Sequence, residues 1–106
     1  MSTCNHGNTA PDYVLKDLHD SQAGKQRHKC TECAYEQGYE AGRQHPLTPG
    51  GNSECEQTGL RAPSEMLETL PESQAGPGRH KCAICAYHEG FQRGRMGAQS
   101  APNTSQ

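Results

Sequence analysis

The sequence contains few of the residues from which a hydrophobic core is normally built. Among its 106 residues there is no tryptophan and one phenylalanine, and hydrophobic residues make up 30% of the total. The mean hydropathy is -1.02. Chains this small and polar usually need disulfides, bound metal or oligomerisation to stay folded. The six cysteines are therefore the residues best suited to hold this fold together.

Two kinds of hydrophobic segment are also missing. No apolar run approaches the roughly 20 residues of a membrane-spanning helix. No charged stretch followed by an apolar one marks a signal peptide at the N-terminus. We therefore expect a cytoplasmic protein. Because disulfides are rare in the reducing cytosol, its paired cysteines are expected to bind zinc.

One stretch of sequence occurs twice. RHKCTECAYEQGYEAGR occupies residues 27–43, and RHKCAICAYHEGFQRGR occupies residues 79–95. Residues 10–43 and 62–95 are identical at 18 of 34 positions, with a constant offset of 52 residues. Self-similarity of this kind indicates one structural unit written twice. Features that both copies share are expected to be needed by that unit.

Each unit is predicted to contain a short helix, a Cys-x-x-Cys knuckle and a second helix. Ala10-Pro11-Asp12 and Ala62-Pro63-Ser64-Glu65 have the pattern of helix starts. Apolar residues at helical spacing follow each start: Val14, Leu15 and Leu18, and Met66, Leu67 and Leu70. The second helices are expected to end near Arg43 and Arg95. The predicted fold class is a small, irregular, metal-stabilised α+β protein with two repeated zinc-binding units.

The predicted division of the chain has four parts. A first zinc-binding unit covers residues 1–45, a linker covers 46–54, a second unit covers 55–95, and a tail covers 96–106. The linker is rich in Pro, Gly and Ser, and the polar tail is expected to be disordered. This division leaves open whether the two units pack together or move independently.

Each predicted second helix has an edge of small residues. The set at i, i+4 and i+8 occurs twice: Ala34, Gly38 and Gly42, and Ala86, Gly90 and Gly94. A glycine inside a helix costs about 1 kcal/mol relative to alanine, so the helices could fray there. Because the edge recurs, we instead expect it to let two helices, or a helix and its own zinc loop, approach closely.

The duplicated cysteines and histidines predict two metal sites. Structural zinc is held by four thiolate or imidazole ligands in a tetrahedron. Aligning the two copies matches the Cys-x-x-Cys pairs, the histidine two residues upstream of each pair, and one earlier cysteine. The predicted Cys3His sets are Cys4, His28, Cys30 and Cys33, and Cys55, His80, Cys82 and Cys85. They would hold two zinc ions per chain.

Two unduplicated histidines compete for the fourth ligand position. His6 lies close to Cys4 in the sequence, and His88 follows Cys85 by one helical turn. His28 and His80 could instead form a basic strip with the Arg and Lys residues beside them. The identity of the fourth ligand therefore stays open in both units.

The pattern resembles small treble-clef and zinc-knuckle modules, in which a Cys-x-x-Cys loop leads into a helix and a distant ligand pair completes the site. The Arg-His-x-Cys-x-x-Cys knuckles are similar to those of bacterial restriction-type nucleases of the HNH class. The His-Asn-His catalytic residues of that class have no counterpart after either knuckle. Here, moreover, the distant ligands precede the knuckle instead of following it. The resemblance thus implies a zinc module without nuclease activity.

The residues around the predicted zinc sites favour a protein that is not an enzyme. Catalytic zinc keeps one coordination position open, whereas the predicted sets are closed. The predicted function is nucleic-acid binding through the basic second unit, with phosphate contacts from Arg79, Lys81, Arg93 and Arg95. The alternative is a protein–protein interaction or scaffolding module of a bacterial regulatory or defence complex.

The two copies differ in charge although the net charge is only -2. Residues 79–95 contain four basic side chains against Glu89. Residues 27–43 contain three basic side chains against three acids: Glu32, Glu36 and Glu40. Acids at i, i+4 and i+8 are expected to lie along one helical face. That face would repel a polyanion, so any nucleic acid is expected to contact residues 55–95.

Overall fold

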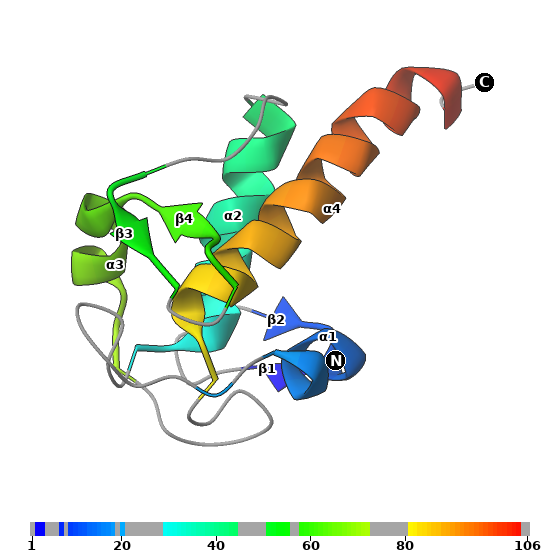
Figure 1. Ribbon diagram of the computed structural model, residues 1–106. Coiled ribbons are helices and arrows are strands. Elements are labelled where there is room, and N and C mark those ends of the chain that lie inside the picture. Colours follow the sequence, from blue (N-terminus) through cyan, green and yellow to red (C-terminus); the bar gives the residue numbers. More distant parts are fainter. Residues whose placement is uncertain are drawn as a thin grey trace.

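The helices and strands of the computed structural model follow one another in an order that occurs twice along the chain (Figure 1). A two-stranded hairpin, a short helix and a longer helix are followed by a second hairpin, a short helix and a longer helix. The structure describes residues 2–3, 7, 9–18, 20, 29–44, 51–55, 58–72 and 81–104, with side chains described as far as Met96.

The first half begins with strands β1 (Ser2–Thr3) and β2 (Thr9–Ala10), which pair antiparallel. Helix α1 (Asp12–Asp17) follows at once, and helix α2 (Thr31–Gln44) comes later. Pro11 precedes α1 with φ of -65°, the value that a helix start requires. Asp12 places a negative charge in the first turn, where the helix dipole favours it.

The second half repeats these elements. Strands β3 (Ser53–Glu54) and β4 (Arg61–Ala62) pair antiparallel, and helices α3 (Ser64–Thr69) and α4 (Ala83–Thr104) follow. Pro63 precedes α3 with φ of -65°, as Pro11 does for α1. The starts of β4, α3 and α4 lie 52 residues after those of β2, α1 and α2. The start of β3 lies 51 residues after that of β1, because the second hairpin has one residue more.

The elements differ from the expected ones at several boundaries. The two-residue strands were not foreseen, since they are too short to show alternating polarity. Strand β3 takes up the last two residues of the predicted linker, 46–54. Helix α4 continues to Thr104 instead of ending near Arg95, so residues 96–104 are helical. That stretch contains good helix formers in Met96, Ala98, Gln99 and Ala101, although Gly97 and Pro102 are poor ones.

Helices α2 and α4 pack side by side at the centre of the molecule, and the hairpins and short helices lie around them (Figure 1). The predicted apolar stripes of the short helices are buried, with Val14, Leu15, Leu67 and Leu70 all less than 5% exposed. One hydrophobic core joins both halves. The predicted small α+β fold is confirmed. None of the described helices is both long and apolar enough to cross a membrane.

Glycines set the distance between α2 and α4. A Cβ atom added at Gly38 would overlap the carbonyl oxygen of Tyr87, and one at Gly90 would overlap that of Tyr35. Gly42 and Gly94 meet the backbone of the opposite helix in the same way. The expected close approach of two helices is therefore confirmed. Each half contributes equivalent residues, because the contacts of Gly38 and Gly90 are related by the 52-residue offset.

The two halves also exchange backbone contacts away from the helix crossing. Asp20 forms an antiparallel bridge with Lys81, and Lys29 forms one with Glu72. Asp20 and Glu72 are related by the 52-residue offset, and so are Lys29 and Lys81, so the two bridges are equivalent. The segment after each short helix is thus bridged to the residue just before the knuckle of the other half.

The two lysines at these bridges bind the ends of the short helices in the opposite halves. Lys29 Nζ donates to the carbonyl of Leu70, at the end of α3, over 3.1 Å. Lys81 Nζ donates to the carbonyl of Lys16, in the last turn of α1, over 3.4 Å. It also lies 3.3 Å from Asp20 Oδ1. A cation stabilises the carbonyl end of a helix, so each half caps a helix of the other.

Candidate metal centre

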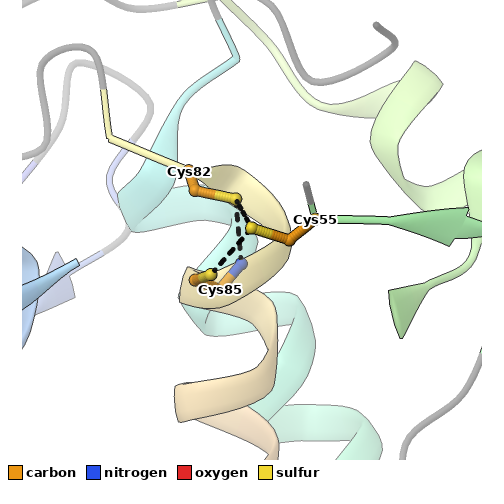
Figure 2. A group of neighbouring side chains, drawn as sticks. All are labelled: Cys55, Cys82 and Cys85. Atoms are coloured by element: carbon orange, nitrogen blue, oxygen red, sulfur yellow. Dashed lines mark hydrogen bonds between the residues drawn. The ribbon is translucent and has the colours of Figure 1, made fainter. Parts of the chain in front are cut away.

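Three cysteines from two segments of the second half meet in one place (Figure 2). Cys55 directly follows β3, Cys82 directly precedes α4, and Cys85 lies in the first turn of α4. Cys55 Sγ lies 3.4 Å from Cys82 Sγ and 3.5 Å from Cys85 Sγ. All three sulfurs fall within 4.8 Å of one another.

Local backbone structure explains why the sulfurs converge. The chain turns tightly after Cys55, whose N–H donates to the carbonyl of Leu60 and whose carbonyl accepts from Gly59 N–H. Gly59 has φ of 74°, a conformation that favours glycine. At the start of α4, the Cys85 N–H points to Cys82 Sγ over 3.5 Å. The hairpin loop and the helix start thereby direct their thiols to the same point.

The spacing of the sulfurs fits a tetrahedral metal ion. Ligands bound at about 2.3 Å in a tetrahedron lie about 3.8 Å apart, close to the observed distances. As whole residues, Cys55, Cys82 and Cys85 are 1%, 0% and 4% exposed. Hydrogen bonding with Cys82 and burial raise the pKa of the Cys85 thiol. A bound dication would compensate three thiolates held this closely, and it would deprotonate them.

The fourth corner of this tetrahedron has two candidates from the sequence. His80, the predicted ligand, lies outside the described residues. His88 is described on α4 and is partly buried, and burial lowers its pKa. Within the described ranges, the group of metal-ligating atoms contains the three cysteines and no histidine. The sequence analysis did not identify Thr58, whose Oγ1 lies 3.4 Å from Cys85 Sγ. Its position in the turn after Cys55 is the sequence feature that could have placed it near the cysteines.

The corresponding part of the first half is described only in part. Cys30 and Cys33 are 0% and 2% exposed at the start of α2, as Cys82 and Cys85 are at the start of α4. The Cys30 N–H donates to the carbonyl of Pro71 in the other half over 2.9 Å. The remaining predicted ligands, Cys4 and His28, and the competing His6 lie outside the described residues.

Two of the four predicted phosphate contacts, Lys81 and Arg93, have partners within the protein. Lys81 forms the contacts with α1 and Asp20 described above. The Arg93 guanidinium lies 5.2 Å from the centre of the Tyr13 ring and donates to the Tyr13 hydroxyl over 3.1 Å. Its Nε is 3.7 Å from Glu89 Oε1. Arg95 is partly exposed on α4, and Arg79 lies outside the described residues.

The three acids of α2 do not share one exposed face. Glu32 is 3% exposed, and the Cys30 thiol donates to its Oε1 over 3.6 Å. Glu36 is partly exposed, and Glu40 is exposed and pairs with Arg43 at 3.0 Å. Because Glu32 is buried, it adds no exposed charge to that side of α2. The prediction of a negative face formed by all three acids is therefore wrong.

The resemblance to treble-clef and zinc-knuckle modules remains a prediction. In the second half, a Cys-x-x-Cys pair does lie at the start of a helix, and the third cysteine precedes it in sequence. Comparison of the chain with protein-family models, with curated proteins and with solved structures finds no match.

Proposed function

We propose that this is a non-enzymatic zinc protein with two repeated metal-binding halves, and that it acts as a binding module for another protein. The cluster of Cys55, Cys82 and Cys85 carries the proposal, because its buried thiols have the spacing of structural zinc ligands. The near absence of exposed sulfur supports a structural ion, since a catalytic zinc needs an accessible coordination position.

A second zinc site in the first half is supported by equivalent positions. Cys30 directly precedes α2, and Cys33 lies in its first turn. Cys82 and Cys85 have the same positions relative to α4. Cys4 directly follows β1 in the sequence, as Cys55 follows β3. The duplicated histidines His28 and His80 complete the two proposed sets, because they alone occur at equivalent positions before both knuckles.

Zinc content tests this proposal directly. The whole protein, purified under reducing conditions, should contain two zinc ions per chain in native mass spectrometry. His28→Ala and His80→Ala should each lower the content by one, because each removes a fourth ligand. His6→Ala and His88→Ala are the matched controls and should leave it at two. One zinc ion in the unmodified protein would contradict the duplicated site, and none would overturn the metal proposal.

The internal contacts of the basic residues favour protein binding over nucleic-acid binding. Of the four predicted phosphate contacts, Lys81 and Arg93 already interact with carboxylates and with groups on α1. Binding a phosphate would require these internal contacts to be exchanged. Nucleic-acid binding through residues 55–95 stays the second candidate, because α4 carries two arginines, Arg93 and Arg95, close together in its basic stretch.

Titration of nucleic acid separates the two candidates. A short duplex and a single strand, added to the whole zinc-loaded protein at low salt, should leave the NMR amide signals of residues 81–95 almost unchanged. The reason is that Lys81 and Arg93 are internally paired. Shifts in this segment that fall steeply as salt is raised would instead establish phosphate contacts and favour the nucleic-acid function.

A further inference from the structure

A hollow on the first half is lined by both aromatic and acidic side chains. It has a volume of about 300 Å³ and is bounded by six residues: Thr9, Pro11, Tyr35, Glu36, Tyr39 and Glu40. This volume is at the lower end of the range of about 300–1,000 Å³ found for ligand pockets. The lining comes from the end of the first hairpin, the start of α1 and one side of α2.

The aromatic wall of the hollow is firmly held. The rings of Tyr35 and Tyr39 lie one turn apart on α2, with centroids 6.3 Å apart and planes inclined by 33°. Tyr35 is 6% exposed, and burial raises the pKa of its hydroxyl. Tyr39 packs against the core while remaining partly exposed. An aromatic face next to carboxylates attracts cations, because the ring quadrupole and the negative charges act in the same direction.

The equivalent positions of the second half show that the acids are not needed for packing. Glu36 corresponds to His88 and Glu40 to Gln92, whereas Tyr35 corresponds to Tyr87. The same helix therefore tolerates uncharged residues at both acidic positions. The first half keeps the aromatic wall and adds two negative charges to it.

The protein already contains one arginine bound between an aromatic ring and a carboxylate. The Arg93 guanidinium lies over the Tyr13 ring at 5.2 Å, donates to its hydroxyl, and has Nε 3.7 Å from Glu89. This arrangement combines the stacking and the planar donor geometry that distinguish arginine from lysine. The hollow beside α2 offers the same two kinds of group.

We propose that this hollow binds an arginine side chain presented by a protein partner. The guanidinium stacks on Tyr39 and donates to the carboxylates of Glu36 and Glu40. Glu40 now pairs with Arg43, but both side chains are more than half exposed, and such a pair within one helix is weak and easily exchanged. This inference rests on the proposed function as a protein-binding module and names the chemistry of the contact.

The test uses three small probes with the whole zinc-loaded protein. N-acetyl-arginine N-methylamide, its lysine counterpart and its norleucine counterpart are titrated in turn while amide shifts are followed by NMR. The arginine probe should shift the amides of Tyr35, Glu36, Tyr39 and Glu40, with a dissociation constant on the order of 1 mM. The lysine probe should bind more weakly, and norleucine should not bind, because it lacks the charge.

Matched variants locate the binding. Glu36→Gln and Glu40→Gln should each weaken arginine binding about fivefold. Glu65→Gln, which removes one exposed charge from α3, should leave it unchanged. Tyr39→Phe introduces the residue type of the equivalent position, Phe91, in the second half. It keeps the aromatic ring, so binding should persist.

Three results would overturn the inference: equal binding of lysine or norleucine, an equal loss in Glu65→Gln, or no effect of the Gln variants. Zinc content and the amide spectrum of each variant are measured at the same time. An arginine probe that fails to bind a fully zinc-loaded, folded protein rejects the hollow and leaves the zinc proposal intact. Loss of zinc in the unmodified protein would reject the proposed function itself.

Discussion

Replacing Gly38 with alanine should lower the free energy of unfolding by about 3 kcal/mol or more. Changing an exposed interior glycine of a helix to alanine normally stabilises the protein by about 1 kcal/mol. At Gly38, however, the added methyl group would overlap the carbonyl of Tyr87 and lie 3.0 Å from the Phe91 nitrogen. Backbone atoms cannot turn aside as a side chain does, so α2 and α4 must separate. Urea unfolding followed by circular dichroism measures the change.

Two further variants make this measurement decisive. Gly90→Ala should cost a similar amount, because its methyl group would overlap the carbonyl of Tyr35 in the equivalent contact. Gln37→Ala, at the exposed position next to Gly38, should be neutral or slightly stabilising. If Gly38→Ala were also stabilising, α2 and α4 would not pack through this edge.

Replacing Cys82 with serine should remove zinc from the second half and unfold the helices of both halves together. Structural zinc contributes about 10–16 kcal/mol of apparent binding energy in zinc-finger peptides, as much as the whole stability of a typical domain. The first half would not survive alone, because α2 packs on α4 and each half caps a short helix of the other. Amide signals from α1 and α2 should therefore collapse along with those from α4.

Thr58→Val is the matched control for this experiment. It removes the hydroxyl group 3.4 Å from Cys85 Sγ but leaves the thiols in place, so zinc and fold should both be retained. Native mass spectrometry reports the metal content, and amide spectra report the fold of each half. If α1 and α2 kept native signals in Cys82→Ser, the halves would be independent units and the reciprocal contacts would contribute little.

The joined core also limits how binding can be studied. Lys29 and Lys81 each reach into the opposite half, and the glycine contacts belong to both halves at once. A fragment containing one half would expose the buried side of its long helix. Any affinity is therefore best measured on the whole zinc-loaded chain, with single-residue variants used to assign it to one half.

Several features of the site followed from the sequence because they are local or duplicated. The Cys-x-x-Cys spacing places two thiols at the start of a helix whatever surrounds them, as Cys82 and Cys85 show. The internal alignment paired Cys55 with these two residues across nearly 30 positions, and the structure brings the three together. Recurrence of the small-residue edge similarly predicted a close helix approach.

Other features depend on how the two halves meet, and a single helical pattern does not reveal them. Lys81 and Arg93 were expected to contact phosphate, but their partners Asp20 and Tyr13 come from distant parts of the chain. Glu32 was expected on an exposed face, yet the packing of α2 buries it.

By itself, the sequence determined the repeat, the amphipathic short helices, the glycine edges and the three cysteines of the described cluster. Each of these follows from residue type at fixed spacing, which the backbone converts directly into position. Only the tertiary structure decided that the glycine edges join the two halves to one another. It also decided that Lys81, before α4, and Arg93, on α4, bind groups of the first half. These contacts between the halves depend on complementary surfaces from both, and such surfaces meet only once α2 and α4 have packed together.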